Sequence, residues 1–132
     1  MLRRSYLIIL ALIIVFIVAF ALTHRVADAI RRDYLASGKH SINLPAAVPQ
    51  KWQRVCVLGP NSTADHARAL LGFDWNANAH SNVRKRDDVV LLIFVTANIV
   101  VAATDFPRAD GDLARLAGKC YPRSEAIFTP VL

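Results

Sequence analysis

The sequence predicts an α+β protein: a single N-terminal transmembrane helix followed by a small, mostly antiparallel sheet with one or two helices packed on one face. Three observations support this prediction. The chain has 132 residues, 55% of them apolar, which leaves room for one folded domain and excludes a large multidomain enzyme and a disordered chain. Residues 6–22 form an uncharged apolar run. The remainder alternates strand-like and helix-like segments in the order β-α-β-β-α-(β).

The N-terminal segment favours an uncleaved signal anchor. Residues 1–5 form a basic flank that contains Arg3 and Arg4. Residues 6–22 then give seventeen positions without a charge, amide, Gly or Pro. As a helix this run would rise about 25 Å, near the lower limit for crossing a hydrocarbon core of ~30 Å. We therefore expect a single-pass protein of the bacterial inner membrane, in contact with the lipid bilayer through residues 6–22.

Two other interpretations fit the same segment. The basic flank, the apolar run and the sequence AFA at residues 19–21 also match a signal peptide cleaved after Ala21. Cleavage would release a soluble periplasmic or secreted protein of the inhibitor or immunity type. The apolar run is longer than the ~7–15 residues of a signal-peptide core, which favours the anchor. The sequence RRSYL at residues 3–7 also resembles a twin-arginine export signal.

Residues 23–38 predict an amphipathic juxtamembrane helix that continues the apolar run. Their apolar positions recur every three to four residues, with charged side chains on the other face. These apolar positions are Val26, Ala29, Ile30 and Tyr34. Gly38 supplies the residue type that commonly ends a helix in the left-handed conformation.

Residues 39–50 predict a stiff linker. They contain Pro45 and Pro49 among small and polar residues and show neither helical nor strand periodicity. Proline favours extended backbone, which would hold the following domain away from the membrane. A short irregular strand is the competing interpretation.

The domain at residues 51–132 begins with a strand, a turn and a helix. Residues 52–58 are rich in β-prone side chains and end at a Gly-Pro turn signal. Residues 64–71 are strong helix formers that end before Gly72. Three capping side chains precede this helix, namely Asn61, Ser62 and Thr63.

The second half of the domain predicts a hairpin, a short helix and a last edge strand. Residues 89–95 and 99–104 are rich in β-branched side chains and are separated by a break at residues 96–98. Residues 113–117 could form a helix that ends at Gly118, and residues 126–128 could add an edge strand.

Cys56 and Cys120 are the two cysteines of the chain, and we interpret them as a disulfide bond. A bridge would suit an oxidising compartment, which places the domain in the periplasm. Two unrelated buried thiols are the alternative.

Charge argues against nucleic acid as a partner. The chain carries a net charge of +6, yet residues 50–132 hold ten Lys plus Arg against eight Asp plus Glu. The folded part is therefore nearly balanced and lacks the basic face that nucleic-acid binders present.

No pattern in the sequence predicts catalysis, a metal or a cofactor. Ser62, Asp65 and His66 have the residue types of a hydrolase triad, but they are neighbours at a helix start, where the ordinary roles of Ser and Asp are capping and compensation of the helix dipole. His66, Asp74 and His80 have ligand chemistry without the spacing of a metal motif. Gly59 and the other glycines form no phosphate-binding loop, and no small-molecule substrate is evident.

The sequence therefore favours a non-catalytic envelope protein that binds a protein partner, as an accessory or docking subunit. Its candidate partner surface combines aromatic and basic side chains, the types that dominate interface hot spots. These residues are Phe73, Trp75, His80, Arg84 and Arg86. Core packing is the alternative role for Phe73 and Trp75. The cleaved inhibitor-type protein and a small hydrolase are the two other functional hypotheses.

Overall fold

The structure is a computed structural model that describes residues 2–131; within the first helix, side-chain surroundings are described for residues 3–17 and from residue 25 onward. The helices are α1 (Leu2–Ala36), α2 (Leu44–Ala47), α3 (Ala64–Leu71) and α4 (Ala77–His80). The strands are β1 (Ile42–Asn43), β2 (Arg54–Leu58), β3 (Val89–Thr96), β4 (Ile99–Pro107), β5 (Lys119–Pro122) and β6 (Ile127–Phe128). Four 3-10 turns, η1 (Val83–Lys85), η2 (Arg108–Asp110), η3 (Ala114–Leu116) and η4 (Arg123–Glu125), complete the described elements.

A four-stranded antiparallel sheet in the order β4-β3-β2-β5 forms the centre of the fold. The predicted first strand is β2, and the predicted hairpin is β3 and β4, joined at Ala97 and Asn98. The predicted tail strand is β6, which pairs with β1 in a separate two-stranded antiparallel sheet. The α+β class and the mostly antiparallel sheet are thus confirmed.

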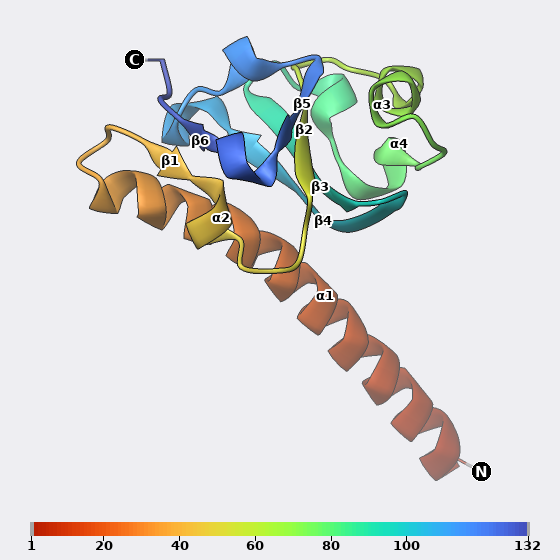
Figure 1. The fold of residues 1–132 in the computed structure, drawn as a ribbon. Coiled ribbons are helices and arrows are strands. Elements are labelled where there is room, and N and C mark those ends of the chain that lie inside the picture. The colour runs from red at the N-terminus through yellow and green to blue at the C-terminus, as the bar shows by residue number, and fades with distance from the viewer. Residues whose placement is uncertain (1, 132) are drawn as a thin grey trace.

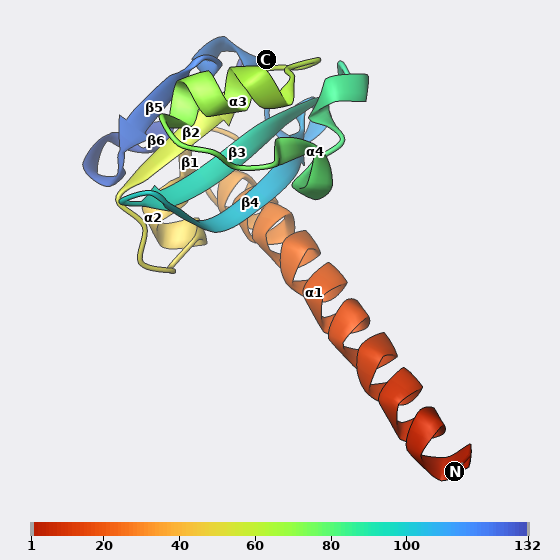
Figure 2. The same ribbon diagram turned by 90° about the vertical axis from the view of Figure 1, so that its right-hand side faces the viewer.

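Both faces of the main sheet are covered, which corrects the prediction of helices on one face. The C-terminal half of α1, with α2, β1 and β6, covers one face, and α3 and α4 cover the other (Figures 1 and 2). Phe94 and Val90 of β3 point into the first core, whereas Ile93 and Leu91 point into the second. This explains why β3 is an unbroken apolar run, because a strand buried on both faces needs no polar alternation.

Helix α1 has two halves with different surroundings. Val26, Ile30 and Tyr34 pack against the sheet, as the predicted amphipathic pattern requires, and Gly38 has a φ of 72° just beyond the helix end. Figures 1 and 2 show that the N-terminal half leaves the sheet and projects away from the rest of the molecule. We call residues 3–17 the arm and residues 25–131 the head.

The transmembrane prediction is wrong. Within the part of the chain that the structure describes, no helix is both long enough and apolar enough to cross a membrane. The predicted single-pass location in the inner membrane is wrong for the same reason. The side chains of residues 18–22, including the cleavage site after Ala21, lie outside the described residues.

Residues 39–50, expected to form a linker, contribute to the core of the head. Three of their side chains are fully buried or nearly so in the core between α1 and the sheet, namely Ile42, Leu44 and Val48. Asn43 fixes the start of α2, because its side chain accepts a hydrogen bond from the backbone N–H of Ala46 at 3.1 Å. The segment therefore packs against the sheet instead of separating the head from α1.

Helix α3 has the predicted bounds. Thr63 is its N-cap and accepts a hydrogen bond from the backbone N–H of His66, while Gly72 ends the helix at a φ of 81°. By contrast, the helix predicted at residues 113–117 is only a 3-10 turn, and the segment before the tail forms β5. The predicted helix has only five residues, which are too few to form a stable α-helix, because helix nucleation is unfavourable.

The disulfide bond between Cys56 and Cys120 joins β2 to β5. The two residues are direct partners in the antiparallel register, and the bridge faces α3. β5 is a short strand at one edge of the sheet, so the bond fixes this edge to the sheet centre.

Candidate docking surfaces

The arm is the largest exposed apolar feature among the described residues. Eleven large hydrophobic side chains on it are between 50% and 76% exposed. They are Tyr6, Leu7, Ile8, Ile9, Leu10, Leu12, Ile13, Ile14, Val15, Phe16 and Ile17. Because five consecutive positions, residues 6–10, are all exposed, the apolar surface surrounds the helix instead of forming one stripe. This surface takes no part in the packing of the head. An exposed apolar surface of this size is typical of an interaction site, so the arm is a candidate interface.

The N-terminal part of the arm is basic. Arg3 and Arg4 are exposed, and the first turn of α1 contains no acidic side chain. Positive charge at a helix N-terminus is unfavourable with the helix dipole, so these two residues do not serve to stabilise the isolated helix. Between Arg4 and the end of the described arm there is no further charge.

The structure brings together only part of the predicted partner surface. Trp75 stacks on His80, with ring centroids 5.0 Å apart and an angle of 8° between the planes. Phe73 and Trp75 are half-buried and pack against the core under α3, in agreement with the core-packing alternative. Arg84 is exposed in η1.

Arg86 is engaged by a neighbouring carboxylate. Its Nε and Nη2 donate hydrogen bonds to Asp88 Oδ1 and Oδ2 at 2.8 and 2.6 Å. The hydrogen bond from Arg86 holds the pKa of the Asp88 carboxyl below its usual value. Both side chains are exposed, so this ion pair fixes the orientation of Arg86 more than it stabilises the fold.

His80 and Arg86 line a pocket of 330 Å³ between α4, β4 and α1. Asp105 on its wall accepts hydrogen bonds from the Ser81 hydroxyl and from the backbone N–H of Asn82, the latter at 2.9 Å. This carboxylate therefore attaches the segment after α4 to β4. We interpret its role as structural, because both of its oxygens are already hydrogen bonded.

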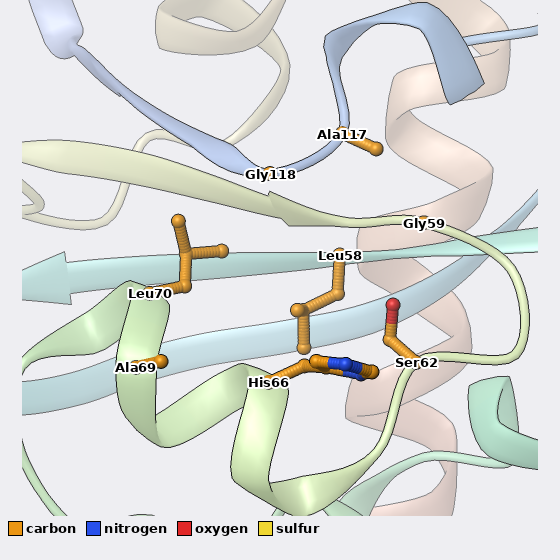
Figure 3. A pocket seen from close by; sticks show the side chains of 8 residues that line it. All are labelled: Leu58, Gly59, Ser62, His66, Ala69, Leu70, Ala117 and Gly118. Atoms are coloured by element: carbon orange, nitrogen blue, oxygen red, sulfur yellow. The ribbon is translucent and has the colours of Figure 1, made fainter.

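A larger pocket, of 560 Å³, lies between α3 and the segment that enters β5 (Figure 3). Its walls are mostly small or apolar, and Ser62 and His66 lie on the α3 side. The other lining residues are Leu58, Gly59, Ala69, Leu70, Ala117 and Gly118. Gly59 packs closely on Ala117, since a Cβ at residue 59 would lie 3.0 Å from the Cβ of Ala117.

The residues of the hydrolase hypothesis do not form a triad. His66 Nδ1 accepts a hydrogen bond from the backbone N–H of Thr63 at 3.0 Å. In a triad this nitrogen would instead donate to a carboxylate. The Asp65 carboxylate lies 3.4 Å from Arg68. His66 thus completes the capping box of α3.

The three candidate metal ligands are held apart by other contacts. Asp74 forms an ion pair with Arg68 at 2.8 Å, His66 caps α3, and His80 stacks on Trp75. Among the residues that the structure describes, no group of three His, Cys, Asp or Glu side chains is placed to hold a metal ion.

Sequence reasoning missed two features of these surfaces. The docking potential of the arm was hidden because its apolar run matched a membrane segment. The pocket beside α3 was hidden because Gly59 and Ala117 meet only through the pairing of β2 and β5, which no local pattern signals.

Comparison of the chain with family models, with curated proteins and with solved structures gave no match.

Proposed function

We propose that this protein is a non-catalytic binding protein, an accessory or docking subunit that meets a protein partner through the arm of α1. The observation that carries the proposal is the ring of eleven exposed large apolar side chains on residues 6–17. Contiguous apolar surface of this kind marks an interaction site on a folded protein.

The head supports the proposal by being internally complete. Its two cores bury the apolar side chains of α1, α3 and the sheet. Within the described part of the chain, every buried side-chain nitrogen or oxygen has a hydrogen-bond partner. The head therefore does not need the arm for its own packing, and the arm remains available for another molecule.

The polar groups beside the main pocket support binding over hydrolysis. His66 is engaged in capping α3, and Asp65 lies beside Arg68. A nucleophile at Ser62 would lack a base that is oriented by a carboxylate.

Site-specific photo-crosslinking of the full chain in cells tests the proposal. A photoreactive residue in place of Ile14 should give protein adducts of higher mass, because the arm would be in direct contact with a partner. The same residue in place of Ile99, a head position that is 65% exposed, is the matched control and should give few adducts. Equal adduct yields at both positions, or none at Ile14, would exclude the arm as the docking element.

A further inference from the structure

The arm has the dimensions of a protein interface. Complete burial of a Leu or Ile side chain is worth about 1.5–3 kcal/mol at 25 cal/mol per Å², which corresponds to roughly 60–120 Å² per side chain. Eleven side chains at 50–76% exposure then offer roughly 400–800 Å². A standard interface buries about 800 Å² on each partner. The whole circumference of the arm therefore offers at most about the area that one partner buries in a standard interface, and because a neighbouring arm covers only one side of it, more than one neighbour is needed to bury it all.

The spacing on the arm is suited to packing against another helix. Every residue from 6 to 17 is apolar, so positions at the three- and four-residue intervals of a coiled-coil seam, such as Leu7, Leu10, Ile14 and Ile17, are apolar in any register. No charged residue lies between residues 6 and 17, so a neighbouring helix would not bury an unpaired charge.

A second copy of the chain is the occupant that satisfies these observations best. It carries an arm of the same length and the same apolar character, and each arm has the same surface to bury. Because the apolar surface surrounds the helix, a second arm meets apolar side chains at any rotational setting. The exposed Arg3 and Arg4 lie at the end of the seam, where they can remain in solvent.

We propose that copies of this chain associate with one another by packing their arms into a helical bundle. The proposal rests on the proposed function and names the partner as a second copy. One arm covers only one side of another, so the bundle can accept more than two copies. The heads lie outside the bundle, because the N-terminal half of α1 carries the arm away from the sheet (Figures 1 and 2).

Sedimentation equilibrium of the purified full chain over a concentration series tests this proposal. We expect a mass of at least two chains. The paired substitutions Leu10→Glu and Ile14→Glu should raise the dissociation constant at least a hundredfold, since each removes apolar burial worth about tenfold or more. The paired substitutions Ile99→Glu and Val101→Glu remove exposed apolar side chains from the head and should leave the mass unchanged.

Three outcomes would overturn the proposal. The first is a monomeric chain at all concentrations whose arm crosslinks only to a different protein; this result leaves the proposed function intact. The second is an oligomer that dissociates with the Ile99 and Val101 substitutions instead of the arm substitutions. The third is a monomer that floats with phosphatidylcholine vesicles and gives no protein crosslinks at Ile14, a result that would remove the proposed function as well.

Discussion

Asp112 illustrates how single residues hold the C-terminal part of the head together. Arg108 Nε and Nη2 donate to its two carboxylate oxygens at 3.1 and 2.9 Å, and the backbone N–H of Ala114 donates to Oδ1 at 3.0 Å. Its carbonyl oxygen accepts a hydrogen bond from the backbone N–H of Val131 at 3.1 Å. One residue therefore links η2, η3 and the end of the described chain.

This geometry predicts an acid-dependent loss of stability. The hydrogen bond from Arg108 is the main cause that lowers the pKa of Asp112 in the folded state below its usual 3.8. A lowered pKa favours folding at pH values above the unfolded-state pKa, and this contribution is lost as the pH falls through the folded-state value. Asp112→Asn should therefore flatten the decrease of the free energy of unfolding below about pH 4, measured by urea denaturation at several pH values.

The size of this effect is limited by solvent. The side chains of Arg108 and Asp112 are 40% and 27% exposed, so we expect a contribution of about 1 kcal/mol or less. Asp74→Asn is the control, because it removes the same charge from a carboxylate that is 89% exposed. If Asp74→Asn reduced the acid-dependent loss of the free energy of unfolding as much as Asp112→Asn does, the specific role of Asp112 would be refuted.

At the level of elements, the sequence predicts those whose signal is local. Helix α3 has capping residues before it and Gly72 after it, and its bounds agree with the prediction. The hairpin of β3 and β4 has two β-branched runs on either side of a short break. By contrast, β5 has four residues, among them Lys119 and Pro122, and it becomes a strand only by pairing with β2. That pairing is a long-range contact that local propensity does not encode.

Residues 39–50 also show that local composition does not predict long-range pairing. Their prolines and small side chains indicate a linker, yet Ile42 pairs with Phe128 across β1 and β6. Phe128 lies more than eighty residues after Ile42 in the chain. The composition of a short segment does not reveal so distant a pairing partner.

Helix α2 contributes a buried side chain to the core of the head, so its packing can be tested by mutation. Leu44 is completely buried among side chains of the first core, so Leu44→Ala should lower the free energy of unfolding by about 2–5 kcal/mol. Ala46→Ser in the same helix changes an exposed position and should have little effect. Urea denaturation of both variants measures the difference. A small effect of Leu44→Ala would mean that this segment is a linker after all.

For the whole molecule, sequence and structure differ most at the N-terminus. The amphipathic part of α1 was predictable, because Ile30 and Tyr34 follow the helical period and are buried. The apolar run before it carries no period, and an all-round apolar helix is compatible with several environments. The structure brings Trp75 and His80 of the predicted surface together, whereas the sequence assigns residues 6–22 to a lipid bilayer.

The head is a small domain that depends on one covalent link. Cys56 and Cys120 are separated by 64 residues in sequence, and their bond closes a loop that contains α3, α4 and the β3-β4 hairpin. In the chain-entropy model, closing a loop of this length stabilises the folded state by about 4 kcal/mol, because it restricts the unfolded chain. Small domains have total stabilities of only about 5–15 kcal/mol, so this single bond is a large fraction of the whole.

We therefore expect reduction to destabilise the entire head and not only the β5 edge. The double substitution Cys56→Ala and Cys120→Ala should lower the free energy of unfolding by about 4 kcal/mol, and a reductant should lower that of the native chain by a similar amount. Reductant should not change the double variant further, which controls for other effects of the reagent. Urea denaturation with and without reductant measures all four values. If the native chain and the double variant unfolded at the same urea concentration, the bond would contribute nothing to the stability of the head. The bond would then not act by restricting the unfolded chain.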